Sequence, residues 1–295
     1  MMEAKFGRGG DMNATAETTG VFTKRGRLPG LVLLLIGLLT ACSGHLAETS
    51  NSRDPKARLA RAEAMFQERC KTAGEKIYRT AEDVEGVFLM KIRPSGVNYD
   101  DQFALTDPYG NDSTGDTYIK TFLTGYHAKS SPPVRGVPPR QGYKYVEAID
   151  PADGKRYRYT GRIDEPWRYD SSYSKSYRRF VLDRVLSPAS PALYAVTYDD
   201  ISTREEREYW IAGSSLKVID LKTNEIMAER IGYMMDRGQG NTSGGRSPWF
   251  WAADHACPTF QRNPFYPIPS GHGASAQSNQ TEDFVEKILK PVQEK

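Results

Sequence analysis

The sequence has few of the features that assign a protein to a specialised class. Its 295 residues contain one long apolar run, three cysteines, four histidines and no marked excess of charge of either sign. A single apolar run excludes a membrane protein with several spanning helices. Lysine and arginine number 40 against 37 acidic residues, and the formal charge of +3 is too small to favour a nucleic-acid partner. The remaining class is a globular protein, and a content of 38% hydrophobic and 26% charged residues is typical of one.

Signatures of catalysis and of metal binding are missing as well. The sequence contains neither HExxH nor GxSxG, and its histidines, at positions 45, 127, 255 and 272, show no metal-ligand spacing. Asp254 and His255 form an acid–histidine pair without a neighbouring nucleophile. A hydrolase that uses this pair is therefore an alternative hypothesis, and no catalytic residue is predicted.

Two further patterns come close to known binding loops. Residues 240–247 (GNTSGGRS) approach the phosphate-loop pattern G-x-x-x-x-G-K-[ST], but Arg246 replaces the lysine, so a flexible Gly/Ser loop is predicted there. Asp107, Asp112 and Asp116 could supply oxygen ligands for Ca²⁺, but their spacing does not match an EF-hand loop and is typical of turns. We therefore predict no cofactor and no metal.

The apolar run lies near the N-terminus and follows a basic segment. Lys24, Arg25 and Arg27 precede residues 31–39 (LVLLLIGLL), which are too few for a helix across about 30 Å of hydrocarbon. A basic flank, a short apolar core and small residues after it are typical of a secretory signal peptide. Residues 1–20 are either an extension of that signal or a stretch upstream of the true translation start.

The end of this run resembles a lipid-attachment site. Leu39-Thr40-Ala41-Cys42 fits the lipobox of bacterial lipoproteins, Leu-(Ser/Thr/Ala)-(Ala/Gly)-Cys, at all four positions. The resemblance implies a signal peptide over residues 1–41, acylation of Cys42, a lipidated tether over residues 42–53 and a single domain over residues 54–295. Several acyl chains anchor a protein stably to a membrane. The serine after the cysteine implies the outer membrane, with the domain facing the periplasm.

Two cysteines remain in the mature chain. Cys70 lies on the apolar stripe of a helix predicted over residues 55–72, and Cys257 lies in the apolar segment 249–258. An even number of cysteines in an oxidising compartment predicts a disulfide bond between them. A reactive thiol at Cys257 beside His255 is the competing interpretation, but side chains two residues apart on a helix point away from each other.

The mature chain is predicted to be one α+β domain. The helix over residues 55–72 and a C-terminal helix after Thr281 are expected to pack on an antiparallel β-meander sheet. Strands are expected at residues 84–92, 116–123, 143–149, 155–159, 180–186, 193–201, 209–212, 216–221 and 225–235. One hairpin is expected to turn at Gly154, and segments 216–221 and 225–235 are expected to form another that turns at residues 222–224. Segments 180–186 and 193–201 are expected to pair as well. A β-propeller is excluded because the required repeat is absent.

Tyrosine and arginine gather in one part of the chain. Seven of the 17 tyrosines lie between Tyr143 and Tyr177, in a segment rich in arginine. Both residue types are enriched at protein interfaces, although tyrosine also favours strands. We predict that this segment presents the surface that binds a partner. Its candidate residues are Tyr157, Arg158, Tyr159, Arg168 and Tyr169.

Three classes of function follow from these patterns. The mature domain resembles the uncharacterised single-domain lipoproteins of Gram-negative envelopes, which implies a non-catalytic protein that binds a protein or another envelope component. An immunity protein against a toxin delivered to the periplasm is one form of such a binder, by analogy. The alternatives are an envelope hydrolase based on Asp254 and His255, and a structural part of a secretion or conjugation assembly.

Overall fold

Most of the chain after residue 53 is described by the computed structural model. The described residues are 54–96, 98–104, 107–109, 113–128, 140–260, 277 and 280–293, and all belong to one unit of the chain, residues 49–295. The strands are β1 (Gly74–Ile77), β2 (Ala81–Val84), β3 (Gly86–Leu89), β4 (Tyr145–Ile149), β5 (Arg156–Asp164), β6 (Arg179–Leu186), β7 (Tyr194–Asp200), β8 (Ile211–Asp220), β9 (Glu225–Met235), β10 (Ala256–Cys257) and β11 (Leu289–Pro291). The helices are α2 (Pro55–Cys70), α3 (Gly115–His127), α4 (Arg204–Glu208), α5 (Pro248–Ala252), α7 (Gln280–Ile288) and the 3-10 turns η1 (Pro166–Arg168) and η2 (Ser243–Gly245).

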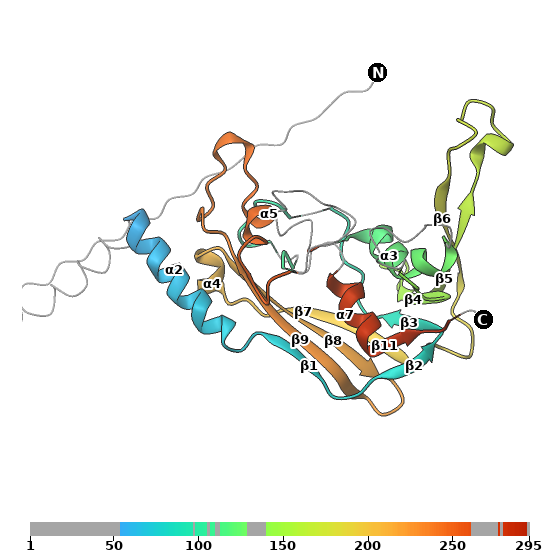
Figure 1. The fold of residues 1–295 in the computed structure, drawn as a ribbon, viewed down its shortest axis with the longest axis horizontal. Coiled ribbons are helices and arrows are strands. Elements are labelled where there is room, and N and C mark those ends of the chain that lie inside the picture. The colour runs from blue at the N-terminus through green and yellow to red at the C-terminus, as the bar shows by residue number, and fades with distance from the viewer. Residues whose placement is uncertain are drawn as a thin grey trace, which may run out of the picture. The chain divides into compact units, whose positions relative to one another are not determined.

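A nine-stranded mixed sheet dominates this unit (Figure 1). Its strand order is β1-β9-β8-β7-β3-β4-β5-β6, and β10 pairs with β9 outside this path. Neighbouring strands run antiparallel except at β3, which runs parallel to both β4 and β7. Strands β2 and β11 form a separate two-stranded parallel sheet.

The antiparallel meander that the sequence predicts is therefore wrong. The sheet is mixed because β3 pairs in parallel on both of its sides. All four residues of β3 are buried, as is usual for parallel strands that are covered on both faces. The chain between β3 and β4 contains α3, which provides the long connection that parallel pairing requires.

The segment 116–123 is a helix and not the predicted strand. It lies within α3, whose buried residues are Tyr118, Ile119, Phe122 and Leu123. These four residues form two adjacent pairs that are spaced four positions apart, and this spacing places all of them on one face of a helix. In a strand, the two members of each pair would point to opposite faces of the sheet. The aromatic and β-branched residues favour strands by propensity, but packing of this face against the sheet decides the structure.

The predicted pairing of residues 180–186 with 193–201 is also wrong. β6 pairs with β5 over all eight of its residues, whereas β7 pairs with β8 and β3 in the middle of the sheet. β5 extends to Asp164 and so offers β6 a full-length neighbour. The two predicted hairpins, β4–β5 and β8–β9, are confirmed, and Gly154 and Asn224 have positive φ in their turns.

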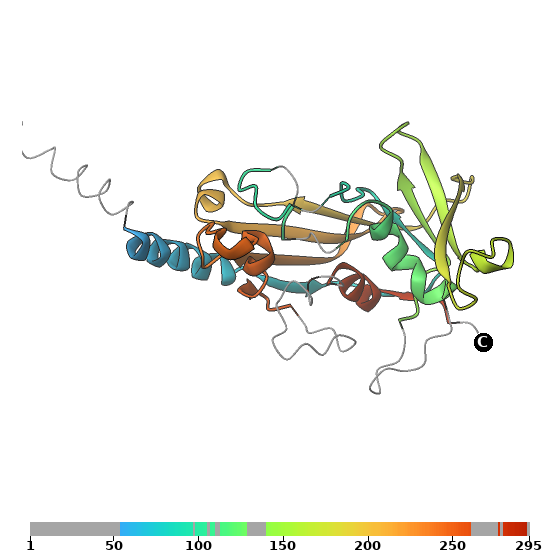
Figure 2. The ribbon, with the colours of Figure 1, turned by 90° about the horizontal axis from the view of Figure 1, so that it is seen from above.

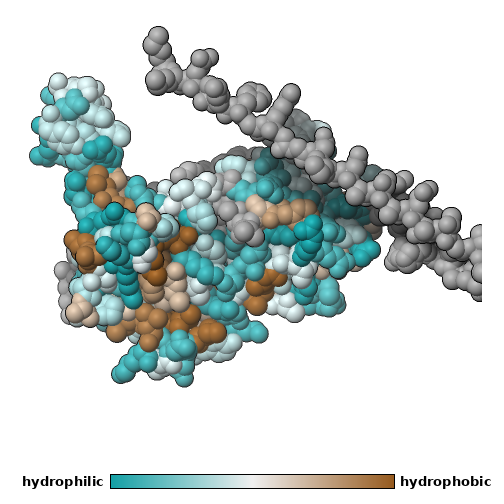
Figure 3. Space-filling model, turned by 180° about the vertical axis from the view of Figure 1, so that it is seen from behind, coloured by the Kyte–Doolittle hydropathy of each residue, from teal (hydrophilic) through white to brown (hydrophobic). Residues whose placement is uncertain are grey.

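Helices α3 and α7 cover the same face of the sheet (Figure 2). The main hydrophobic core lies between them and the strands, and it includes Val87, Leu89, Phe122 and Phe284. Phe88, whose side chain points to the opposite face, packs in a small cluster with Ala192 and Ala195. Figure 3 shows this opposite face, where hydrophobic residues gather among hydrophilic ones. Exposed apolar side chains of this face are Met90, Ile149, Val185, Leu193 and Ile226.

Helix α2 is joined covalently to the later part of the chain. The predicted disulfide between Cys70 and Cys257 is present, with a Cα–Cα distance of 5.5 Å. It links the end of α2 to β10, and α2 buries Ala62 and Phe66 against the residues of β8 and β9. Asp54 caps the helix by accepting a hydrogen bond from the backbone of Lys56. No helix within the described ranges is both long enough and apolar enough to cross a membrane.

Candidate functional site

The far ends of β5 and β6 extend beyond the rest of the sheet. β4 pairs with β5 only as far as Tyr159, so residues 160–164 have β6 as their strand neighbour. Figures 1 and 2 show this extension, which we call the arm and define as residues 160–183. It contains η1 and three exposed tyrosines, Tyr169, Tyr173 and Tyr177, and the rings of the last two stack at 5.3 Å.

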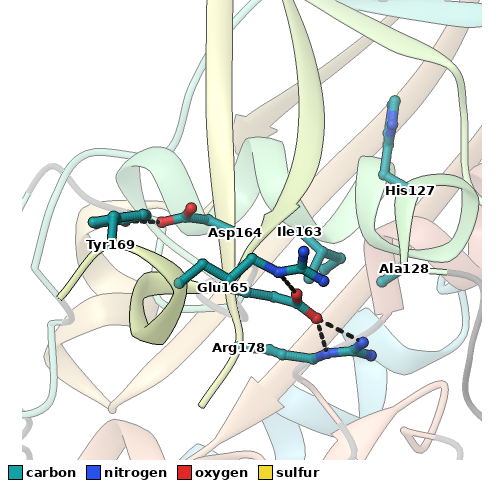
Figure 4. Close-up of a pocket in the computed structure, with 8 residues that line it drawn as sticks. His127, Ala128, Ile163, Asp164, Glu165, Tyr169 and Arg178 are labelled. Atoms are coloured by element: carbon teal, nitrogen blue, oxygen red, sulfur yellow. Dashed lines mark hydrogen bonds and ion pairs between the residues drawn. The ribbon is translucent and has the colours of Figure 1, made fainter. Parts of the chain in front are cut away.

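A hollow of about 620 Å³ lies between the arm and the C-terminal end of α3 (Figure 4). It is lined by His127, Ala128, Ile163, Asp164, Glu165, Arg168, Tyr169 and Arg178. Six of these eight residues come from the arm. The hollow is therefore mainly a property of the arm, and α3 forms its other side.

Asp164 forms one centre of the hydrogen-bond network in the hollow. The hydroxyl of Tyr169 donates to its Oδ2 at 2.7 Å, and Nε of Arg179 donates to the same atom at 2.7 Å. The hydrogen bond from Tyr169, together with that from Arg179, holds the pKa of Asp164 below its usual value. Asp164 is therefore a permanent anion near neutral pH.

Glu165 is the second centre and binds two arginines. Arg178 donates to Oε1 through Nε at 3.0 Å and also lies 2.8 Å away through Nη2, while Arg168 donates to Oε2. These hydrogen bonds, that of Arg168 first, lower the pKa of Glu165. Because both carboxylates of the hollow are held ionised, neither is suited to donate a proton as a general acid near neutral pH.

The arginines, and not the carboxylates, face the solvent. The Glu165 side chain is 14% exposed, whereas those of Arg168 and Arg178 are 67% and 58% exposed. Each carboxylate thus binds the guanidinium groups on their buried side. The remaining N–H donors of these groups are left available to the solvent. Guanidinium groups held in this way are suited to bind carboxylate or phosphate groups, and exposed tyrosine rings add apolar contact area.

His127 occupies the opposite side of the hollow. Its Nε2 donates to the carbonyl oxygen of Lys144 at 2.8 Å, and its ring lies 6.4 Å from that of Phe180. These contacts fasten the end of α3 to the residue that precedes β4 and to the arm. His127 therefore shapes the hollow, and the sequence alone gives no sign of this role.

The structure separates the five predicted partner-binding residues into two groups. Arg168 and Tyr169 line the hollow, and the Tyr169 side chain is 67% exposed. Tyr159 is 5% exposed and belongs to the main core. Tyr157 lies near the β4–β5 turn, where its hydroxyl donates to Asp153 at 2.6 Å. The structure thus places Arg168 and Tyr169 together and away from the other predicted residues.

Arg158 has a structural contact at the opposite face of the sheet. It donates to Oε1 of Glu147 through Nε at 3.0 Å and Nη2 at 2.7 Å, and its guanidinium lies 3.8 Å from the ring centre of Tyr145. Arg156 pairs with the other oxygen of Glu147, whose side chain is fully buried. Burial raises the pKa of Glu147, but the hydrogen bonds from Arg158 and the backbone of Ala192, with the charge of Arg156, outweigh it, so the pKa is lowered.

Glu165 and Arg178 are members of the site that the sequence did not predict. They lie 13 positions apart in the chain and meet across the turn at the end of the arm. The available signal was the acidic pair Asp164-Glu165 before a turn-rich segment and the arginine pair Arg178-Arg179 after it. Opposite charges on either side of a hairpin turn are expected to meet across the two strands.

The alternative sites take part in contacts that stabilise the fold. His255 lies beside Glu63 at 3.3 Å and against the ring of Phe66 at 4.7 Å, close to the disulfide. Arg246, at the lysine position of the phosphate-loop pattern, pairs with Asp236, which is fully buried. Asp236 also accepts hydrogen bonds from the backbone of Gly238 and Gly240, so an internal carboxylate organises this loop.

The three aspartates considered as Ca²⁺ ligands do not form a described cluster. Asp107 is buried and accepts a hydrogen bond from Ser214 at 2.6 Å, and Asp116 lies in the first turn of α3. Asp112 lies outside the described residues, as do Cys42 and the whole lipobox. Within the ranges that the structure describes, no group of three or more His, Cys, Asp or Glu side chains is placed to hold a metal ion.

Comparison with known proteins gives no family for this fold or for the hollow. No protein-family model, no curated protein and no solved structure matches the chain.

Proposed function

We propose that the protein is a lipoprotein of the bacterial outer membrane that binds a protein or envelope partner in the periplasm through its arm. The anchor is supported by the basic residues before the apolar run and by the fit of Leu39-Thr40-Ala41-Cys42 to the lipobox. The disulfide between Cys70 and Cys257 agrees with an oxidising compartment.

The observation that carries the binding proposal is the solvent-facing group of arginines and tyrosines on the arm. Arg168, Arg178 and Tyr169 line one hollow, and the carboxylates beneath them fix the guanidinium groups. Groups that are held in place before binding lose less conformational entropy on association. A surface of this composition suits recognition of a partner better than proton transfer.

The membrane anchor is tested by its cysteine. Intact mass of the protein extracted from membranes should show a chain that begins at Cys42 and carries acyl groups. The Cys42→Ser variant should move from the membrane fraction to the soluble fraction. A variant that stays in the membrane fraction would contradict the anchor and leave the binding surface untouched.

The binding surface is tested by a pair of double variants. Arg168→Ala with Tyr169→Ala should remove a partner that is cross-linked to the protein in its native envelope. Arg204→Ala with Tyr78→Ala is the matched control, because these side chains are 78% and 66% exposed and lie outside the arm. Equal cross-linking by both double variants would show that the arm does not carry the function.

A further inference from the structure

Strand β6 is one end of the sheet, and its outer edge has no strand neighbour among the described residues. It pairs with β5 over eight residues without a bulge and contains no proline. Backbone donors and acceptors along the outer side of such a strand are a template for another extended chain.

The opposite end of the sheet is protected in the usual way. β1 is only four residues long, and its Glu75 pairs with Lys287 of α7. Short strands and charged side chains are common devices that prevent strand addition. β6 lacks this protection at its C-terminal end, where Val185 and Leu186 are 63% and 61% exposed. The two ends of one sheet therefore differ, and the open edge is that of β6, whose residues 179–183 belong to the arm.

The open edge is basic. Strands β5 and β6 together contain five arginines and two aspartates. Both aspartates are paired within the arm, Asp164 with Arg179 and Asp183 with Arg162. The arginine side chains nearest the edge are about half exposed, 47% for Arg179 and 52% for Arg184. β6 itself contains two arginines and one aspartate, so the edge strand has a net positive charge, although Arg179 and Arg184 each also pair with an aspartate of this chain.

We propose that β6 is extended by a strand from a partner protein, and that this strand is an acidic segment with apolar side chains at alternate positions. The inference rests on the proposed function and specifies how the arm binds. Backbone pairing selects a polypeptide, because an anionic lipid or polysaccharide cannot complete the hydrogen-bond ladder. Arg184 selects negative charge on one face of the added strand, and Val185, whose side chain points to the other face, offers an apolar contact to the alternate side chains.

The probe is a labelled peptide of alternating glutamate and valine, about ten residues long, which matches the length of a strand. Two control peptides separate charge from backbone pairing. The lysine–valine peptide reverses the charge, and the glutamate–proline peptide keeps the negative charge but lacks the proline amide donors. Affinity is measured with the full mature protein at about 50 and about 300 mM salt, and amide hydrogen exchange reports on β6.

The glutamate–valine peptide should bind at least about tenfold more tightly than either control, with weaker binding at high salt. Amide exchange should slow in residues 179–186. Arg184→Glu should reduce the affinity, with Arg204→Glu as the control on α4. Arg184 also pairs with Asp150, so Val185→Asp provides a second test at a side chain that has no ion pair of its own to lose. Because Val185 lies opposite Arg158 in the pairing of β5 and β6, the free energy of unfolding of this variant is measured as well, and affinity is compared only for folded protein. Leu193→Asp is its matched control, since both side chains are 63% exposed.

Equal binding of the glutamate–proline peptide would overturn strand addition, and tighter binding of the lysine–valine peptide would overturn the acidic preference. Tighter binding of an anionic polysaccharide without slower exchange in β6 would assign the edge to a glycan. A dimer of the protein alone with protected β6 amides would assign it to a second copy. The two proposals can also be told apart. If the double variant Arg168→Ala with Tyr169→Ala loses envelope cross-linking but the glutamate–valine peptide does not bind the wild type, this inference is refuted and the proposed function is kept.

Discussion

At the scale of single residues, the arginines of β5 and the arm serve two different purposes. Arg158 neutralises Glu147, which is fully buried, through two hydrogen bonds. Arg168 holds Glu165 from the solvent side and remains 67% exposed. Removal of a partner from a buried charge is costly, whereas exposed ion pairs contribute little to stability. The sequence cannot separate these roles, because both arginines lie among tyrosines in the same segment.

Arg158→Ala should therefore lower the free energy of unfolding by about 2–3 kcal/mol, since it leaves Glu147 with Arg156 as its only arginine in the described network. Arg168→Ala should leave this free energy nearly unchanged. Urea unfolding of both variants measures the difference. If the two variants lose the same stability, the buried pair does not have the role that its geometry indicates.

Glu286 should make the free energy of unfolding fall as the pH rises toward neutral, which is the opposite of the effect of a carboxyl group whose pKa is lowered by folding. Burial raises the pKa of this carboxyl group to about 7, against the attraction of Arg140, which lies 3.8 Å away. A raised pKa means that the folded protein holds the proton more tightly than the unfolded chain does. The stability that this group contributes is thus present at low pH and is lost as the pH rises toward 7.

Glu286→Gln keeps a neutral side chain at every pH. The unfolding free energy of the variant minus that of the wild type should increase by about 1–3 kcal/mol as the pH rises from about 5 to about 8. The comparison cancels the titrating groups that do not interact with Glu286, whereas the charge of Asp283 on the same helix contributes to the raised pKa and is part of the measured difference. A difference between variant and wild type that stays constant with pH would contradict the raised pKa.

At the scale of elements, the sequence predicts what is local and misses what depends on distant neighbours. Helix α2 has its N-cap, its apolar stripe and its cysteine in one continuous segment, and its prediction over residues 55–72 agrees with Pro55–Cys70. The hairpins are also local, because Gly154 and Asn224 adopt positive φ in short turns. The parallel pairing of β3 and the hollow of the arm join segments far apart in the chain, and no local pattern records those contacts.

Helix α3 offers a test in which helix propensity and packing oppose each other. Gly125 lies inside this helix, where alanine normally stabilises by about 1 kcal/mol. A Cβ at this position would overlap the backbone of Arg140 and Gln141. Gly125→Ala should therefore destabilise the protein and lower its melting temperature. A higher melting temperature would show that the chain after residue 139 does not pack on α3 as closely as described.

At the scale of the whole molecule, the disulfide joins parts of the chain that are separated by 187 residues. Closing a loop of this length reduces the entropy of the unfolded chain by an amount worth up to about 5 kcal/mol, which is comparable to the net stability of a typical domain. Replacement of Cys70 and Cys257 by serine should thus lower the melting temperature strongly, and reductant should affect the wild type only. If both proteins melt at the same temperature, the link does not stabilise the fold.

The proposed function requires that the arm of this molecule contacts a partner in the envelope. It is tested most directly by placing a photoreactive phenylalanine analogue at Tyr169 in living cells and, separately, at Tyr78. These side chains are 67% and 66% exposed, so they differ in location and not in access. We predict a discrete cross-linked product from position 169 and none from position 78. A product from position 78 alone, or the same products from both positions, would contradict the claim.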